Sequence, residues 1–175
     1  MGDVPMKETL LLIDANSLIH RAFHALPPFT APDGRPSGAL YGLASILIKV
    51  FKERPFRYGA AAFDRPERTH REELYKKYKA TRPPAPDSLI SQIKESRRLI
   101  ESFGIKIFEE PGWEADDIIA TLADRFSKEE NLQIIAVSGD LDLLQIVRDE
   151  KVLAETPQKG VSNTVIYNEE KVKER

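Results

Sequence analysis

The chain has 175 residues and a mass of 19.8 kDa, with 41% hydrophobic and 31% charged residues, which suits one domain with a single core. It contains no cysteine, which excludes disulfides, thiolate zinc sites and a cysteine nucleophile. No apolar run approaches the roughly 20 residues of a membrane span, and residues 1–8 lack the apolar core of a signal peptide. We therefore expect a cytoplasmic protein without a membrane partner.

The formal net charge of −2 results from two segments of opposite charge. Residues 52–82 contain ten basic and five acidic residues, whereas residues 109–150 contain three basic and twelve acidic residues. Basic segments bind anionic polymers, and crowded acids need cations nearby. The asymmetry therefore favours one segment that binds phosphate and another that binds cations.

The first half of the chain alternates between strands and helices. A wholly apolar run at 10–13 is typical of a strand buried on both faces, and a second such run occupies 58–63. Between them, a proline-rich loop at 27–36 precedes apolar residues at helical spacing, which predict a helix over 38–53.

The second half continues this alternation. Thr69 and Glu72 fit a capping-box pattern and predict a short helix that extends to about Lys79. Asp87 is a good N-cap for a longer helix that ends at Gly104. The remaining predicted elements are strands at 105–108, 133–137 and 152–155, helices at 114–126 and 141–147, an edge strand at 164–167 and a final helix capped by Asn168. Such an order indicates an α/β domain with a mostly parallel central sheet and helices on both faces.

Acidic residues follow four of the predicted strands. Parallel sheets bind ligands at the carboxyl ends of their strands, so side chains that follow different strands meet at one edge. Glu114 and Asp117 also share a helix face because they are three positions apart. The seven candidates are Asp14, Asp64, Glu114, Asp116, Asp117, Asp140 and Asp142.

Seven carboxylates in one place require cations. Two unit charges 4 Å apart repel by roughly 4 kcal/mol at an effective dielectric constant of 20. Because no cysteine or histidine accompanies the acids in these stretches, the site offers hard oxygen ligands, which favours Mg²⁺ or Mn²⁺ over zinc. Paired ions in such sites activate a water and stabilise both oxygens of an in-line phosphoryl displacement. The acids therefore predict a metal-dependent phosphodiesterase.

Each acid taken alone also has a purely structural interpretation. Asp14 and Asp140 could be helix caps, and the acids at 114–117 could complement a helix dipole. Four acidic groups at the same end of one predicted sheet favour the metal site over this interpretation.

The basic segment carries tyrosines among its cations. Basic side chains that bind phosphates, together with aromatic faces that stack on bases, are typical of a grip on single-stranded nucleic acid. A solvated helix with Glu72–Lys76 and Glu73–Lys77 pairs explains the pattern equally well. The candidates for nucleic-acid binding are Arg71, Lys76, Tyr78, Lys79 and Arg82, with Arg21 as a further candidate that could reach the phosphate to be cut.

Two other kinds of catalytic site find little support. Ser17 and Ser138 lack a histidine partner because the three histidines are scattered, so a serine-hydrolase triad is excluded. Asp140 and Asp142 form a D-x-D pair, as in haloacid-dehalogenase-type phosphatases. That pair normally follows the first strand of its fold, whereas here it follows the fourth.

Four long motifs stand out in the sequence: LLLIDANSLIHRAFHALPP, AAAFDRPERTHREELYKKYKATRPPAPDSL, GWEADDIIATLADRF and AVSGDLDLLQIV. They resemble the 5′-nuclease domain that begins bacterial DNA polymerase I, a member of the flap-endonuclease superfamily with a PIN-like α/β core and a helical arch. The resemblance runs from about Leu10 to the end of the chain.

The resemblance implies roles for the residues already singled out. The seven acids match the metal-binding carboxylates of the family, which uses Mg²⁺ or Mn²⁺, and two ions are expected. Glu114 would bind a metal or orient its water, and Lys79 and Arg82 would neutralise the phosphate in the transition state. Arg21, Tyr78, Lys79 and Arg82 match residues of the arch that contacts phosphate and flap.

The resemblance also implies a substrate. The family cleaves 5′ ends and 5′ flaps of branched DNA and removes primers during replication and repair. The implied partner is DNA with a 5′ end or flap, including an RNA–DNA primer junction, and the family links the domain to a polymerase.

One departure from the family is expected. Its members continue into a helix-hairpin-helix-like module and carry a further aspartate pair in a G-D-x-S-D-N-x-P-G motif, and both would lie beyond Arg175. Residues 1–175 are therefore expected to form the catalytic core with an incomplete outer metal position. The alternatives are a PIN-like ribonuclease and a module that binds a single-stranded 5′ end with weak or no cleavage.

Overall fold

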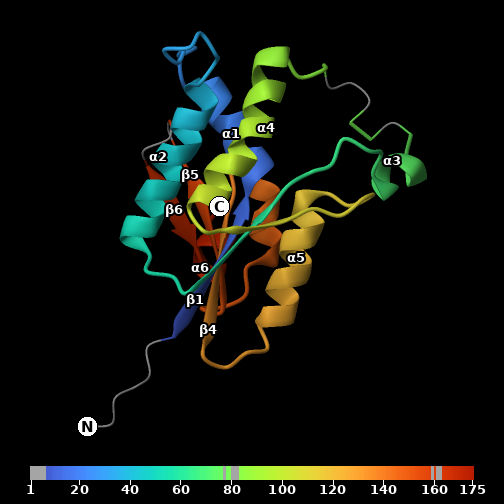
Figure 1. Ribbon diagram of the computed structural model, residues 1–175. Helices are drawn as coiled ribbons and strands as arrows, with labels where there is room; N and C mark the ends of the chain where they lie inside the picture. Colours follow the sequence, from blue (N-terminus) through green and yellow to red (C-terminus); the bar gives the residue numbers. More distant parts are fainter. Residues whose placement is uncertain (1–6, 77, 80–82, 159, 161–162) are drawn as a thin grey trace.

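A six-stranded sheet forms the centre of the computed structural model, which describes residues 7–76, 78–79, 83–158, 160 and 163–175 (Figure 1). The strand order is β3-β2-β1-β4-β5-β6; β6 is antiparallel to β5, and the other pairings are parallel. The strands are β1 (Glu8–Asp14), β2 (Tyr58–Ala62), β3 (Lys106–Phe108), β4 (Leu132–Val137), β5 (Val152–Pro157) and β6 (Thr164–Tyr167).

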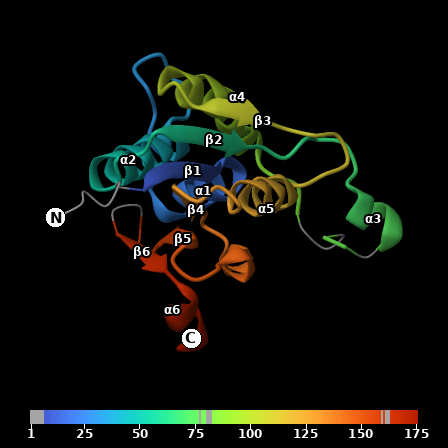
Figure 2. The ribbon, with the colours of Figure 1, turned by 90° about the horizontal axis from the view of Figure 1, so that it is seen from below.

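Helices cover both faces of this sheet (Figure 2). Helices α1, α2 and α4 pack on one face, and α5 and the 3₁₀ helix η1 pack on the other. None of the helices in the described part of the chain is long and apolar enough to cross a lipid bilayer. The helices are α1 (Ala15–Ala25), α2 (Gly38–Glu53), α3 (His70–Leu74), α4 (Asp87–Ser102), α5 (Ala115–Phe126), η1 (Leu141–Ile146) and α6 (Glu169–Lys173).

The apolar run of β1 is buried on both faces, as predicted. Leu11 and Ile13 pack with α1 and α2, whereas Leu10 and Leu12 pack with α5. Alternate side chains of a strand point to opposite faces, so one run of four apolar residues supplies both layers of the core. The prediction of a mostly parallel α/β domain is confirmed.

Strand β1 lies between β2 and β4, and the three strands end together. Asp14 is paired with Ala62 at the end of β2, and Ile13 is paired with Val137 at the end of β4. The chain leaves β1 toward β2 first and returns later to add β4 on its other side. Ligands of open α/β sheets bind where the strand order reverses in this way.

Helix α3 is shorter than predicted. The capping-box pattern predicts a helix from Thr69 to about Lys79, but the backbone leaves the helix at Tyr75, which has a φ of −135°. The Thr69 side chain makes no capping hydrogen bond, and Lys79 has a φ of 52°. Tyr78 and Lys79 instead reach back to the acidic site described below. Figures 1 and 2 both show α3 away from the sheet.

Two other helices also differ from prediction, one in its N-cap and one in its type. Asp87 is the first residue of α4, and Pro86 takes the N-cap position that was predicted for it. A carboxylate in the first turn still complements the positive end of the helix dipole. The helix predicted over 141–147 is the 3₁₀ helix η1, whose tighter winding suits a short connection. No range was predicted for α1.

Candidate active site

A cavity of about 260 Å³ opens at the carboxyl ends of the central strands. The polar residues Asn16, Ser17 and His20 line it, together with Tyr78 and Lys79. The structure also brings six of the seven predicted acids to its wall, and these come from four separate loops: Asp14, Asp64, Glu114, Asp116, Asp140 and Asp142.

Asp14 lies at the bottom of the acidic cluster and is 2% exposed. It is the N-cap of α1, where its Oδ1 accepts a hydrogen bond from the Ser17 N–H at 2.9 Å. Its Oδ2 accepts a hydrogen bond from the Ser138 hydroxyl at 2.7 Å. Burial raises the pKa of Asp14 to about 7, although both hydrogen bonds lower it, and repulsion from Asp116 and Asp64 adds to the increase.

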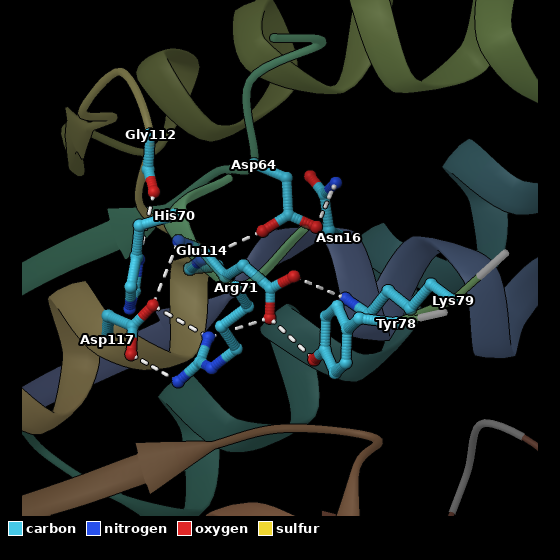
Figure 3. Close-up of polar contacts among 10 residues, drawn as sticks. Asn16, Asp64, His70, Arg71, Tyr78, Lys79, Gly112, Glu114 and Asp117 are labelled. Atoms are coloured by element: carbon cyan, nitrogen blue, oxygen red, sulfur yellow. Dashed lines mark hydrogen bonds and ion pairs between the residues drawn. The ribbon is translucent and has the colours of Figure 1, made fainter. Parts of the chain in front are cut away.

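Asp64 joins the end of β2 to the start of α5. Its Oδ1 accepts a hydrogen bond from the Ala115 N–H at 2.7 Å, and its Oδ2 accepts one from the Asn16 amide at 3.1 Å (Figure 3). Asn16 Oδ1 is buried and has no hydrogen-bond partner among the described residues. Asn16 therefore orients a carboxylate with one end of its amide and leaves an acceptor at the cavity wall with the other.

Asp116, Asp140 and Asp142 complete the acidic wall. Burial, together with repulsion from Asp140, Asp64 and Glu114, raises the pKa of Asp116 to about 6, although Lys79 acts to lower it. Asp140 caps η1, since its Oδ1 accepts a hydrogen bond from the Asp142 N–H at 3.0 Å. The structural interpretation of these acids and the metal interpretation are thus compatible, because caps can face a cavity.

Glu114 is surrounded by donors from the segment around α3 (Figure 3). Its Oε1 lies 2.7 Å from Lys79 Nζ, and its Oε2 accepts hydrogen bonds from Arg71 Nη1 at 2.9 Å and the Tyr78 hydroxyl at 3.1 Å. The Glu114 side chain is 7% exposed, so water screens these contacts poorly. A residue predicted to bind metal is therefore bound here by three residues predicted to bind DNA.

Asp117 does not line the cavity. Both of its oxygens accept hydrogen bonds from Arg71, at 2.8 and 2.5 Å, and Oδ2 also accepts one from the Glu114 N–H at 3.1 Å. Burial lowers the pKa of Arg71, but Asp117 and Glu114 outweigh this effect and raise it. Asp117 thus holds Arg71 beside Glu114 instead of facing the other acids.

Two of the remaining predicted basic residues lie away from the acidic cavity. Lys76 is exposed, Arg82 lies outside the described residues, and Arg21 lines a neighbouring hollow. Three residues that the sequence analysis left without a role, Asn16, His20 and Ser138, line the cavity or orient its acids. Asn16 and Ser138 lie inside the D-x-N-S and S-G-D motifs, and this was a usable signal because polar neighbours of metal-binding carboxylates often orient them; His20 lies in neither motif.

The side chains of the cavity suit a hard divalent ion. Within the described ranges, no three acidic or histidine side chains are grouped as closely as a metal ion requires. The acids nevertheless offer oxygen ligands, and burial, with repulsion between the acids, raises the pKa of Asp14 and of Asp116, so negative charge at these carboxylates is costly without a cation. A divalent cation compensates such an excess, and the donor set therefore fits Mg²⁺ or Mn²⁺.

Comparison with known proteins gives relatives of two kinds. The chain is 40% identical over 171 residues to DNA polymerase I of Mycobacterium tuberculosis and 39% identical over 165 residues to a 5′-3′ exonuclease of Aquifex aeolicus. These matches cover 97% and 94% of this chain. The chain spans 19% of the length of the polymerase and 55% of that of the exonuclease.

Solved structures with the same fold are more distant in sequence. The T5 D15 protein crystallised with metal ions has a TM-score of 0.71 at 18% identity, over 95% of this chain and 60% of that protein. The catalytic core of Rad2 in complex with DNA has a TM-score of 0.55 at 17% identity, over 97% of this chain and 50% of that core. The PIN-like fold that the sequence motifs imply is thereby confirmed. Residues 9–175 match the model of the 5′-3′ exonuclease N-terminal, resolvase-like domain, and the chain belongs to this family of nucleases.

Proposed function

We propose that this chain hydrolyses phosphodiester bonds at the 5′ ends and 5′ flaps of DNA, with Mg²⁺ or Mn²⁺ as its cofactor. The observation that carries the proposal is the cavity in which six carboxylates from four loops surround about 260 Å³ at the strand-order reversal of the sheet. The family match and the two relatives named above support the same activity.

Asp14, Asp64, Asp116, Asp140 and Asp142 are the residues that would hold the ions, with Glu114 as a further ligand. When bound, divalent ions supply positive charge that stabilises an in-line displacement at phosphorus. Ser138, Asn16 and the N–H groups of Ser17 and Ala115 fix the carboxylates of Asp14 and Asp64 in place. Two of the proposed ligands are thus oriented before a cation arrives, which lowers the cost of organising them.

Arg71, Tyr78 and Lys79 are proposed to bind the substrate phosphates. Tyr78 and Lys79 line the cavity, and Arg71 lies beside them; all three donate hydrogen bonds to Glu114. An incoming phosphate offers the same donors a negative oxygen, so these side chains exchange one anionic partner for another as DNA enters. We include Arg82 with them on the basis of its motif, and Lys76 as an exposed cation of the same segment.

The setting of the reaction is also a proposal. The similarity to DNA polymerase I over about a fifth of its length suggests that the cleavage accompanies DNA synthesis, for example at an RNA–DNA primer junction. The cytoplasm is the compartment that we propose.

The test uses a DNA substrate with a fluorescent 5′ flap, incubated with the protein and 10 mM Mg²⁺ or with EDTA. We expect cleavage with Mg²⁺ and none with EDTA. Asp116→Asn should slow cleavage by roughly 100-fold or more, since even outer-shell partners of metal ligands contribute about 10- to 100-fold. Asp124→Asn is the matched control, because Asp124 is an exposed aspartate on the same helix.

Three results would contradict the proposal. Cleavage that persists in EDTA would show that the reaction needs no divalent ion. Undiminished cleavage by Asp116→Asn would show that the acidic cavity is not the site of cleavage. Faster cleavage of an RNA flap than of the DNA flap would favour a ribonuclease instead.

A further inference from the structure

Asp117 lies outside the acidic cavity, although its neighbour Asp116 lines that cavity. An α-helix has 3.6 residues per turn, so consecutive side chains project about 100° apart. Asp117 is at the third position of α5, where its Oδ2 accepts a hydrogen bond from the Glu114 N–H at 3.1 Å. Its carboxylate is therefore placed beside the cavity, on the side from which the segment around α3 reaches the site.

Arg71 occupies both carboxylate oxygens of Asp117 (Figure 3). Its Nη2 lies 2.5 Å from Asp117 Oδ1, and its Nη1 lies 2.8 Å from Asp117 Oδ2. Such a two-pronged pair fixes the plane of the guanidinium as well as its position. A metal ion bound to Asp117 would have to displace one of these two hydrogen bonds. The geometry therefore favours Arg71, and not a cation, as the partner of Asp117.

The same arginine also reaches Glu114. Its Nη1 donates to Glu114 Oε2 at 2.9 Å, so one nitrogen of Arg71 joins two carboxylates. The Arg71 side chain is 35% exposed, whereas that of Asp117 is 17% exposed. A long arginine side chain loses much conformational freedom when it is held in one rotamer, and two contacts offset this loss better than one. Asp117 supplies the contact that remains when Glu114 takes another partner.

A second contact attaches the start of α3 next to Arg71. The His70 N–H donates to the Gly112 carbonyl at 2.9 Å, and His70 Nδ1 lies 3.1 Å from the same oxygen. The His70 ring packs on Trp113 with a distance of 4.3 Å between the ring centroids. Trp113 is the only tryptophan in the sequence and is 47% exposed, so tryptophan fluorescence reports on this contact.

We propose that Asp117 is a positioning residue for Arg71 and not a metal ligand. It holds the guanidinium beside the cavity while Glu114 exchanges Arg71 for a cation, so that Arg71 stays in place for a substrate phosphate. The proposal rests on the proposed function, which assigns that phosphate to Arg71. It replaces the metal-binding role that the resemblance implies for Asp117.

Metal affinity separates the roles of the two neighbouring aspartates. Binding of Mn²⁺ to the DNA-free protein is measured at physiological salt by electron paramagnetic resonance of the free ion. Asp116→Asn should weaken Mn²⁺ binding by roughly tenfold or more, since even outer-shell partners of a metal contribute that much. Asp117→Asn should stay within about threefold of the wild type, because salt screens charges that do not touch the ion. A loss equal to that of Asp116→Asn would overturn the proposal.

The fluorescence of Trp113 in EDTA tests the contact without metal or DNA. Removing either partner of the Arg71–Asp117 pair should loosen α3 and shift the emission of Trp113. Because the two side chains act as one unit, the double variant Asp117→Asn/Arg71→Met should shift the emission no further than Arg71→Met alone. Glu73→Gln removes an exposed charge from the same helix, so this control should emit like the wild type. Unchanged emission in Asp117→Asn, or fully additive shifts, would contradict the proposal.

Cleavage of the flap substrate at saturating Mg²⁺ measures what the positioning contributes. Asp117→Asn should raise KM by roughly tenfold, as the loss of one charge-assisted contact to phosphate does, and change kcat by less than about twofold. A lower kcat at an unchanged KM would show that the proposal is wrong. A wild type that binds no Mn²⁺ and does not cleave would refute the proposed function, whereas the emission of Trp113 would still decide whether Asp117 positions Arg71.

Discussion

The two walls of the acidic cavity are built in different ways. Asp14 and Asp64, at the strand ends, accept hydrogen bonds from backbone N–H groups and from the neutral side chains Ser138 and Asn16. Across the cavity, the segment around α3 is connected to the site through Arg71, Tyr78 and Lys79, which bind Glu114. The first wall is part of the sheet, whereas the second is held by charged side chains.

This difference separates the parts of the site that are fixed from those that can exchange partners. Hydrogen bonds from backbone and buried hydroxyl groups persist whatever ion enters the cavity. Ion pairs of long, partly exposed side chains are weakened by salt and by competing ions. We infer that the strand wall is prepared for metal in advance and that the α3 wall adjusts when metal and phosphate bind.

Replacing Ser138 by alanine should produce the largest loss of stability. The change removes a hydrogen bond to a buried carboxylate and leaves the Asp140 N–H without its 2.9 Å acceptor, so we expect a loss of about 2–3 kcal/mol. Urea unfolding measures this loss. Ser102→Ala removes an exposed hydroxyl and should change stability by less than about 0.5 kcal/mol. Equal losses of stability in the two variants would contradict the inference that hydrogen bonds hold the strand wall in place before metal binds.

Metal binding should stabilise the wild type by a similar amount. At a hundred times its Kd, an ion stabilises the folded state by about 2.7 kcal/mol, which corresponds to a rise in Tm of roughly 5–10 °C for a domain of this size. Thermal unfolding with and without Mg²⁺ measures the rise. Asp116→Asn should reduce it, and a Tm that does not respond to Mg²⁺ or Mn²⁺ would mean that the acids do not bind an ion.

The raised pKa of Asp116 predicts a pH-dependent difference in stability. Because the folded protein binds this proton more tightly than the unfolded chain, the Asp116 carboxyl destabilises the metal-free fold increasingly as pH rises from about 4 to 6. Asp116→Asn should therefore be more stable than the wild type at pH 8 by about 1–2 kcal/mol after solvent screening, and equal to it at pH 4. Urea unfolding in EDTA across this range measures the difference. A constant difference at all pH values would show that the crowding of the acids is not its cause.

The smallest effect is expected on the α3 wall. Lys79→Met removes one ion pair with Glu114 while Arg71 and Tyr78 remain, so the loss should be about 0.5–1 kcal/mol at low salt. In 1 M NaCl this loss should nearly vanish, whereas the loss from Ser138→Ala should persist. A salt-independent loss of stability for Lys79→Met would show that the α3 wall, like the strand wall, is not held by salt-sensitive ion pairs.

The sheet was more predictable than the segment that closes the site. The six strands follow from apolar runs and turns, because a strand buried on both faces has a local pattern. The end of α3 was wrongly predicted because Tyr78 and Lys79 find their partner in Glu114, 36 and 35 residues away, and a pattern window does not contain it. Glu114 and Asp117 were predicted to share a helix face, but Glu114 is the N-cap of α5 and forms a capping box with Asp117, whose side chain is directed by Arg71.

The central position of β1 also has a consequence for folding. Its pairing with β2 joins residues about 48 positions apart, whereas its pairing with β4 joins residues 124 positions apart, as in Leu10–Tyr58 and Leu10–Ile134. A longer loop costs more chain entropy to close and slows the search for the contact. Asp140 follows β4 and joins the other acids only through this long-range pairing, so its repulsion of Asp116 is absent from the unfolded chain and arises as the sheet is completed. The contact that creates the active site is thus also one of the slowest to form.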